Sequence, residues 1–224
     1  MNKPYIICHM MTSVDGRIDC AMTSQLPGVE DYYKTLDGLN VPTTVSGRVT
    51  AELEMAEPGF FEAKNSETYS QEGFSIKADA KGYEIIVDTK GKLLWPDASD
   101  MDKPYLIITS EQVTKEYLAY LDGQHISWIA CGKERIDLVR ACEILASEFG
   151  VERMGIVGGP AINTGFLDAG LLDEISILMG AGIDARREMP SVFDGFAMDH
   201  PLVHLKLTNV QRFDSDPISI PYKL

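Results

Sequence analysis

The most informative local pattern in the chain is Ile156-Val157-Gly158-Gly159-Pro160-Ala161-Ile162-Asn163-Thr164-Gly165. An apolar, β-rich run enters two glycines, and Pro160 then suits the first position of a helix, where no backbone N–H is needed. Glycines let a ligand approach the backbone closely, and the N–H groups at a helix start favour an anion. The stretch therefore predicts a strand, a turn and a helix that can hold a phosphate. A plain turn that uses glycine for its backbone freedom is the alternative, because the strict G-x-G-x-x-G fingerprint is absent.

Two further junctions have the same character. Ser46-Gly47-Arg48-Val49-Thr50 follows a short β-branched run, and its arginine can form a forked contact with a phosphate. Thr12-Ser13-Val14-Asp15-Gly16-Arg17 follows the first apolar run of the chain. Taken singly, the former is explained as well by a surface arginine at a helix end, and the latter by a capped turn. Together the three junctions stand at the ends of separate predicted strands, which is where open α/β sheets bind ligands.

Outward from these junctions, apolar runs alternate with helical patterns. This alternation predicts an α/β fold with a mostly parallel central sheet covered on both faces, and the tail adds a C-terminal antiparallel hairpin. The polar stretch 56–82 predicts a long loop of the kind that serves as a lid or substrate loop. No linker is evident, so residues 1–224 are expected to form a single domain. We expect strands at Tyr5–Met11, Pro42–Ser46, Tyr83–Val87, Tyr105–Thr109, Ile126–Cys131, Arg153–Val157, Glu174–Met179, Leu202–Phe213 and Ile218–Lys223. We expect helices at Val29–Leu39, Arg48–Met55, Glu111–Leu121, Asp137–Phe149 and Ala161–Ala169.

Composition narrows the classes of function. The 224 residues include 34 acidic and 20 basic side chains, a formal net charge of −14. Nucleic-acid binding is largely excluded because phosphate backbones need clustered Lys and Arg, and an anionic membrane surface is disfavoured as a partner. Four cysteines and four histidines show no disulfide or metal-ligand spacing, so no metal is expected. The apolar N-terminal run is too short for a signal peptide or a membrane span, which predicts a cytoplasmic protein.

The three junctions together resemble those of the dihydrofolate reductase-like superfamily. The resemblance rests on Ser-Val-Asp-Gly-Arg at 13–17, on Gly-Arg-Val-Thr at 47–50, and on Gly-Gly-Pro at 158–160 followed by Phe-Leu-Asp-Ala-Gly-Leu-Leu-Asp-Glu at 166–174. It covers the chain from about Pro4 to Tyr222. Within the superfamily, the chain is most similar to the pyrimidine reductase domain of riboflavin biosynthesis, without the deaminase domain often fused ahead of it. The resemblance implies the three-layer dihydrofolate reductase-like fold and a homodimer.

The function implied by the resemblance is reduction of a small heterocyclic substrate with NADPH as the cofactor. It favours a 5-amino-6-(5-phosphoribosylamino)uracil reductase-like enzyme of riboflavin biosynthesis. Two alternatives stay open: a dihydrofolate- or pterin-like reductase with another substrate, and a nucleotide-binding module without catalysis. Oxidation of NADPH by a heterocycle separates the enzymes from the binding module.

The resemblance also assigns cofactor contacts to residues of this chain. Residues 159–164 would lie along the pyrophosphate and nicotinamide side, and residues 11–16 would close over the nicotinamide. Arg48 and Thr50 would hold the adenosine phosphates, and the loop at residues 109–110 would border the adenine. The expected cofactor-binding residues are Met11, Ser13, Gly16, Ser46, Gly47, Arg48, Thr50, Thr109, Ser110, Gly158, Gly159, Pro160, Ala161, Ile162, Asn163 and Thr164.

The substrate side departs from the riboflavin reductases at several positions. His9 stands where those enzymes usually carry Lys, Val157 where they carry Glu near the substrate, and Glu54 where they often carry Asp. Their substrate-phosphate Arg has no counterpart, because residues 56–64 contain one basic side chain, Lys64. We therefore expect Val157 and Glu54 to line the substrate, and we expect the substrate or its mode of binding to differ from the standard uracil intermediate.

Three residues are candidates for handling the proton that accompanies reduction. His9 suits proton delivery near neutral pH, although a histidine beside apolar strand residues is also commonly a hydrogen-bonded structural group. Glu54 and Asp15 are the carboxyl candidates, and Asp15 has the alternative role of stabilising its own turn. The expected catalytic residues are therefore Glu54, His9 and Asp15.

Overall fold

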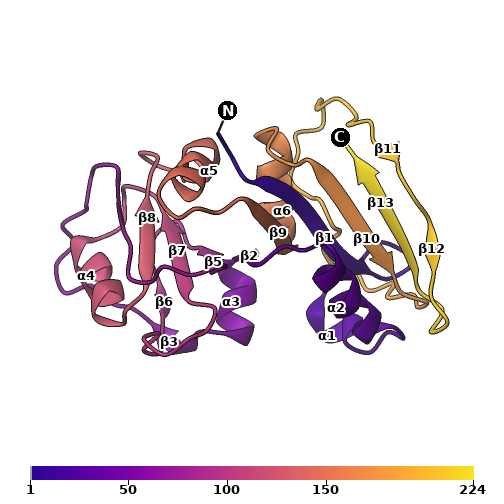
Figure 1. Cartoon of the computed structure of the whole chain (residues 1–224), viewed down its shortest axis with the longest axis horizontal. Helices are drawn as coiled ribbons and strands as arrows, with labels where there is room; N and C mark the ends of the chain where they lie inside the picture. The colour runs from indigo at the N-terminus through magenta and orange to yellow at the C-terminus, as the bar shows by residue number, and fades with distance from the viewer. Residues whose placement is uncertain (1) are drawn as a thin grey trace. The chain divides into compact units, whose positions relative to one another are not determined.

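The computed structural model describes residues 2–224, which form two compact units (Figure 1). The first unit comprises Pro42–Met154 together with residues 2–4, and the second comprises Tyr5–Val41 and Gly155–Leu224. Each unit combines strands with helices. The first contains the junction at residues 46–50, and the second contains the junctions at residues 12–17 and 156–165.

The first unit is built on five strands, of which four are parallel. Every residue of the four parallel strands except Glu84 is buried, and two of the strands contain the continuous apolar runs 85–87 and 105–108. An edge strand pairs antiparallel with the last of them, and a separate antiparallel pair lies outside this sheet. In sheet order the five strands are β2 (Thr43–Gly47), β5 (Glu84–Val87), β7 (Tyr105–Thr109), β8 (Ser127–Ala130) and β4 (Gly73–Ser75). The separate pair consists of β3 (Glu57–Phe60) and β6 (Leu93–Leu94).

The helices of the first unit are α3 (Arg48–Glu54), α4 (Lys115–Gly123) and α5 (Leu138–Ser147). α3 packs against β2, and α4 packs against β8. Thr114 and Asp137 cap α4 and α5, because their side chains accept hydrogen bonds from Tyr117 N at 3.2 Å and Arg140 N at 3.0 Å. The core centres on Trp95, whose indole N–H donates to the Tyr117 hydroxyl at 3.0 Å. The Tyr117 hydroxyl in turn donates to the Leu93 carbonyl at 2.9 Å, so both of these buried polar groups have hydrogen-bond partners.

The second unit pairs β1 with β10 in parallel, and its remaining C-terminal strands are antiparallel. α2 packs against β1. β9 enters this unit at Gly155 and lies next to β1. The strands are β1 (Tyr5–Thr12), β9 (Arg153–Gly158), β10 (Glu174–Met179), β11 (Lys206–Leu207), β12 (Gln211–Arg212) and β13 (Ile218–Lys223). The helices are α1 (Cys20–Thr23), α2 (Val29–Gly38) and α6 (Pro160–Asp168).

Strand register places pairs of junctions side by side within each unit. In the first unit Gly47 lies opposite Val87 in the parallel pair of β2 and β5, so the turns that follow the two strands emerge together. In the second unit Thr12 lies opposite Met179, and Gly180 N donates to Thr12 O at 2.8 Å. The carboxyl ends of neighbouring parallel strands therefore bring distant parts of the sequence into contact.

The predicted fold class is confirmed: the pairing is mostly parallel, with antiparallel strands at the C-terminal end. The single strand predicted over 202–213 is wrong, since the structure has the two short strands β11 and β12 there. Their partner β13 contains Pro221, which has no N–H, and both the N–H and the hydroxyl of Thr208 donate to its carbonyl. The helix predicted from Glu111 begins instead at Lys115, because Thr114 is its cap. The short elements α1 and β6 were not predicted, and the stretch 56–82, which was expected to be mostly loop, contains the short strands β3 and β4.

Candidate functional site

The junction after β1 forms a closed turn. Ser13 is fully buried; its N–H donates to the Arg17 carbonyl at 3.0 Å, and its Oγ accepts from the Arg17 N–H at 3.0 Å. Gly16 has a φ of 79°, which glycine adopts without strain. Met11, near the end of β1, is buried. The turn matches the capped-turn alternative, and the nicotinamide contacts of Met11, Ser13 and Gly16 stay predictions.

Asp15 accepts hydrogen bonds from three groups. Its Oδ1 accepts from Asp184 N at 3.0 Å and from Ser13 Oγ at 2.7 Å, and its Oδ2 accepts from Ala185 N at 3.0 Å. These donors, Asp184 N–H first among them, lower the pKa of Asp15 to about 2. Asp15 is therefore a carboxylate near neutral pH and has no proton to deliver.

The junction after β9 has an open backbone. Gly159 caps α6 without a side-chain hydrogen bond and has a φ of 70°, and Pro160 is the first residue of the helix, as predicted. No atom of residues 2–224 lies within 4 Å of a Cβ built on Gly159. Gly158 is buried, and Val157, Pro160 and Ile162 are half-buried, whereas Ala161 is exposed. A ligand can thus approach this turn without meeting a side chain.

Two buried residues in the first turns of α6 reach toward another loop. Asn163 donates through Nδ2 to the Val192 carbonyl at 2.8 Å, while its Oδ1 has no hydrogen-bond partner among residues 2–224. Thr164 Oγ1 accepts from Asp194 N at 2.8 Å. Both side chains therefore anchor the segment that follows β10, in addition to the cofactor contacts predicted for them.

In the first unit, the junction after β2 presents a cation beside a buried hydroxyl. Ser46 is fully buried, and its Oγ has no hydrogen-bond partner in the described part of the chain. Gly47 caps α3 in an extended conformation with a φ of −89°, so this position does not need glycine for its backbone. Arg48 forms an ion pair with Glu52, one turn along α3, at 2.8 Å. Thr50 is half-buried on the same helix.

Both side chains of the loop at residues 109–110, which was predicted to border the adenine, are buried. Thr109 is buried and its hydroxyl donates to the Ser110 carbonyl at 2.7 Å. Ser110 Oγ donates to the Thr89 carbonyl at 2.9 Å. The Ser110 side chain thus holds the turn after β5, whereas the Thr109 hydroxyl stays within its own turn. The contact of both residues with an adenine stays a prediction.

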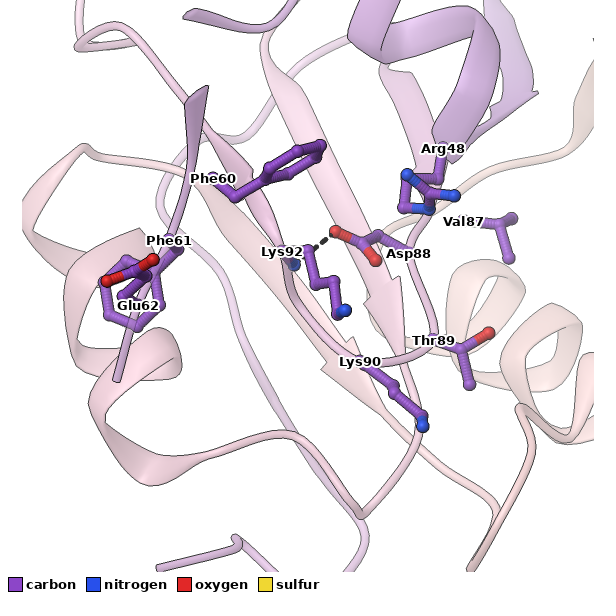
Figure 2. A pocket seen from close by; sticks show the side chains of 9 residues that line it. All are labelled: Arg48, Phe60, Phe61, Glu62, Val87, Asp88, Thr89, Lys90 and Lys92. Carbon is purple, nitrogen blue, oxygen red and sulfur yellow. Dashed lines mark hydrogen bonds between the residues drawn. The ribbon is translucent and has the colours of Figure 1, made fainter. Parts of the chain in front are cut away.

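A cavity of about 620 Å³ lies within the first unit and contains three basic side chains (Figure 2). Arg48 enters it from the start of α3, and Lys90 and Lys92 come from the turn after β5. That turn is fixed by Asp88, whose Oδ2 accepts from the backbone N–H groups of Lys92 at 2.6 Å and Leu93 at 3.2 Å. Two carboxylates, Glu62 and Asp88, line the same cavity, so its three cations leave an excess of one positive charge. In a chain with a formal charge of −14, this local excess suits an anionic ligand.

The lysines were not predicted as site residues. Their place in the sequence could have identified them, because Lys90 and Lys92 flank Gly91 in the turn that follows the buried strand β5. This is the strand-to-turn position that marks the three predicted junctions. No ion pair of either lysine side chain occurs within residues 2–224.

His9 and Glu54 differ in their exposure to solvent. His9 is fully buried, with Nδ1 3.0 Å from Ser176 Oγ and Nε2 3.2 Å from the Tyr32 carbonyl, and its ring stacks on Tyr32 at 4.6 Å. Burial lowers the pKa of His9 to about 4. These contacts are those of the structural alternative, with a neutral imidazole held in the core. Glu54, at the end of α3, is exposed.

Buried polar side-chain atoms without a hydrogen-bond partner fall in the predicted junctions. Within residues 2–224 they are Arg17 Nε, Ser46 Oγ and Asn163 Oδ1. One belongs to each of the three junctions. Buried polar groups nearly always have partners in folded proteins, and an exception calls for an explanation such as a bound molecule.

Two further searches concern ions and membranes. No set of three or more His, Cys, Asp or Glu side chains in residues 2–224 is arranged to hold a metal ion. No helix in the same range is both long enough and apolar enough to cross a bilayer.

Comparison with known proteins places the chain in a family. Over 211 residues it is 24% identical to a 2,5-diamino-6-ribosylamino-4(3H)-pyrimidinone 5′-phosphate reductase of Methanothermobacter thermautotrophicus, covering 88% of this chain and 87% of the relative. A pyrimidine reductase-like protein of Corynebacterium diphtheriae has a similar structure, with a TM-score of 0.74 at 17% identity, covering 99% of this chain and 92% of that one. Riboflavin biosynthesis reductase Rib7 of Saccharomyces cerevisiae gives a TM-score of 0.63 at 18% identity, with 100% and 91% covered. These two structures share the fold. Because residues 4–219 match the RibD C-terminal domain, the chain belongs to the RibD C-terminal domain family.

Proposed function

We propose that this chain is an NADPH-dependent reductase of a phosphorylated ribosylaminopyrimidine. The observation that carries the proposal is the position of the buried side-chain atoms without a hydrogen-bond partner, one in each predicted ligand junction: Ser46 Oγ, Asn163 Oδ1 and Arg17 Nε, the last of which lies 3.9 Å from Asp15 Oδ2. Such atoms are rare in folded proteins, and a bound molecule is a common reason for them. Membership of the RibD C-terminal domain family supports the proposal that the molecules bound at these junctions are the cofactor and substrate of a reductase.

The residues present fit NADPH in each unit. In the first unit, the cavity that contains Arg48, Lys90 and Lys92 suits a phosphate group of NADPH, because cations bind phosphate oxygens through charge-assisted hydrogen bonds. In the second unit, the open backbone at Gly159 suits a pyrophosphate, and Asn163 Oδ1 offers a free acceptor. When bound, NADPH supplies a hydride, and the chain supplies binding, orientation and a proton.

The substrate assignment starts from a relative's name. The Methanothermobacter relative is named for a pyrimidinone with an amino group at ring position 2, where a uracil carries an oxygen. We therefore propose 2,5-diamino-6-ribosylamino-4(3H)-pyrimidinone 5′-phosphate as the substrate, ahead of the uracil that the resemblance favours. Val157, half-buried next to Gly158, offers the substrate an apolar surface where a glutamate would offer hydrogen bonds. This difference supports substrate contacts unlike those of the uracil reductases.

Glu54 is the proton-handling residue of this proposal. His9 is enclosed in the core with a lowered pKa, and Asp15 is ionised and accepts three hydrogen bonds. Glu54 has an exposed side chain at the end of α3, the helix that begins at Arg48. A carboxyl group that exchanges freely with solvent can be reprotonated after each turnover.

The experiment is an assay with purified protein, NADPH and the diaminopyrimidinone phosphate. The proposal predicts NADPH oxidation that depends on the substrate, together with a product that carries two more hydrogen atoms in its mass spectrum. Affinity for NADPH without oxidation by any heterocycle would favour the nucleotide-binding module. Oxidation by dihydrofolate or a pterin alone would favour the alternative reductase.

We further propose a homodimer. Apolar side chains are exposed along the segment that contains β11, where Leu202 is 81% and Leu207 is 51% exposed. β11 is also the edge strand of its sheet, with backbone groups available for pairing. Leu207→Asp is expected to shift the protein from dimer to monomer in sedimentation equilibrium, while Leu53→Asp, at an exposed position of α3, is the control. A monomeric wild type would contradict the proposal.

We also propose that the chain acts as one reductase domain in the cytoplasm. The family match over residues 4–219 runs through both compact units, which supports a single functional domain. The four cysteines are free thiols, and three of them are buried, which suits a reducing compartment.

A further inference from the structure

A segment without helix or strand is fastened to the turn after β1. We call residues 182–194 the strap; it follows β10. Val14 N donates to the Gly182 carbonyl at 2.8 Å, and Ile18 N donates to the Pro190 carbonyl at 3.3 Å. Between these points, Asp184 N and Ala185 N donate to the two carboxylate oxygens of Asp15, each at 3.0 Å. The strap therefore lies along the whole turn.

The far end of the strap is fastened to α6. Val192 offers its carbonyl to Asn163 Nδ2 and Asp194 offers its N–H to Thr164 Oγ1, both at 2.8 Å. The strap thus connects the turn at residues 13–18 with the start of α6, entirely within the second unit. The family resemblance implies that residues 11–16 close over the nicotinamide and that residues 159–164 lie along the pyrophosphate and nicotinamide side of the cofactor.

The backbone of the strap includes conformations that contacts with other segments must stabilise. Ala185 has a φ of 52° and Glu188 has a φ of 62°, left-handed conformations that residues other than glycine rarely adopt. Such conformations persist where surrounding contacts impose them. At Ala185 that contact is the hydrogen bond from its own N–H to Asp15 Oδ2.

We propose that Asp15 is a positioning residue, whose carboxylate fastens the strap and so fixes the turn after β1 relative to the start of α6. This inference rests on the proposed function for its catalytic consequence. A carboxylate is suited to the task because each of its two oxygens faces an N–H donor. Asparagine keeps one acceptor but turns an NH₂ group toward a second donor, and alanine removes both acceptors.

The fastening is tested first without any ligand. Hydrogen–deuterium exchange of strap peptides is compared among the wild type, Asp15→Asn, Asp15→Ala and the control Asp199→Asn, which removes the same charge at an exposed position beyond the strap. We expect exchange to be about tenfold faster in the strap of both Asp15 variants, since opening there costs less free energy, and unchanged in the control. Unchanged exchange in Asp15→Ala overturns the inference whatever the activity. Asp15→Asn supplies the same comparison where Asp15→Ala does not fold.

The positioning role is tested by separating kcat from cofactor affinity. Both Asp15 variants are expected to lose about tenfold or more in kcat, because small misplacements of reacting groups are costly. Their Kd for NADPH should change much less, since Asp15 accepts its hydrogen bonds from the turn and the strap and is not proposed to contact a phosphate. Faster exchange with an unchanged kcat overturns the positioning role. A wild type without NADPH oxidation refutes the proposed function instead, and the exchange experiment then still decides whether Asp15 fastens the strap.

Discussion

Arg48 Nη1 lies 2.8 Å from Glu52 Oε2, one turn along α3, and the two side chains are 39% and 40% exposed. Such a half-exposed pair at i,i+4 spacing contributes only about 0.3–0.5 kcal/mol to stability. The pair also affects binding, because Glu52 competes with any phosphate for the same guanidinium. Arg48 also lines the cavity that contains Lys90 and Lys92, so the ion pair with Glu52 reduces the positive charge that Arg48 offers to a ligand there.

Substituting Arg48 should weaken NADPH binding, whereas substituting Glu52 should strengthen it. Arg48→Ala is expected to weaken NADPH binding by about ten- to a hundredfold and to leave NADH binding nearly unchanged, because a charge-assisted bond to the 2′-phosphate is worth roughly 1.5–3 kcal/mol. Glu52→Ala should tighten NADPH binding by about twofold, since it frees Arg48 from a pair worth about 0.3–0.5 kcal/mol. Fluorescence titration with both cofactors measures these changes.

Lys81→Ala controls for the loss of a positive charge, because Lys81 is exposed and does not line the cavity. Equal affinities of the wild type for NADPH and NADH would contradict the assignment of Arg48. So would an equal loss of affinity in Arg48→Ala and Lys81→Ala.

Gly159→Asp is expected to abolish cofactor binding in a protein that stays folded. The new carboxylate would stand at the start of α6, where the helix dipole tolerates it but where it repels a pyrophosphate. Gly170→Asp is the matched control: φ is 64° there and 70° at Gly159, and at both positions an added Cβ meets no atom of residues 2–224 within 4 Å. Circular dichroism checks the fold and NADPH titration checks binding. Retained affinity in Gly159→Asp, or equal loss in both variants, would place the cofactor elsewhere.

Val157 is expected to set the preference between the two pyrimidine substrates. We predict that the wild type reduces the 5-amino-6-(5-phosphoribosylamino)uracil with a kcat/KM below about 10⁴ M⁻¹s⁻¹, under the usual range for native substrates. Val157→Glu should raise that value by roughly five- to two-hundredfold, because a restored hydrogen bond is worth about 1–3 kcal/mol. Val157→Leu is the apolar control. A wild type that already exceeds the stated rate with the uracil would show this prediction to be wrong.

His9 should make the folded protein sensitive to mild acid. The pKa of His9 is about 4 in the folded state, against an ordinary value of 6.5. Between pH 6.5 and pH 4, the unfolded chain therefore binds a proton at His9 that the folded chain does not bind. The stabilisation is therefore complete above pH 6.5 and is lost as the pH falls toward 4, a total of about 3 kcal/mol. Urea unfolding of the wild type, His9→Gln and the exposed-site control His125→Gln between pH 4.5 and 7.5 measures it. The His9→Gln profile should be flatter, and parallel profiles would refute the buried neutral histidine.

The parallel part of the fold could be read from the sequence because its signals are local. Runs such as Ile85-Ile86-Val87 and Leu106-Ile107-Ile108 are buried on both faces and stand out as continuous apolar segments. The C-terminal tail could not be read in the same way. β13 has the bounds Ile218–Lys223 that the sequence predicts, whereas β11 and β12 are two-residue strands with exposed side chains and contain no apolar run that would mark them.

The site could be predicted only as far as its junctions. Lys90 and Lys92 join Arg48 through the register of β2 and β5, which places Gly47 opposite Val87, and no local pattern reveals that register. The strap meets the turn at residues 13–18 for a similar reason, since Thr12 lies opposite Met179. The burial of His9 also depends on tertiary packing, through the Tyr32 ring and carbonyl of α2.

The central claim is that this chain reduces the ribosylaminopyrimidine phosphate with NADPH. The most direct measurement is the mass spectrum of the product formed by the wild type from 2,5-diamino-6-ribosylamino-4(3H)-pyrimidinone 5′-phosphate and NADPH carrying deuterium at the transferable C4 position. We predict a ribitylamino product with one deuterium atom from the cofactor and one hydrogen from solvent, formed in step with NADPH oxidation. Unchanged substrate after complete saturation with NADPH, or a reduced product without deuterium from both C4-labelled epimers, would contradict the claim.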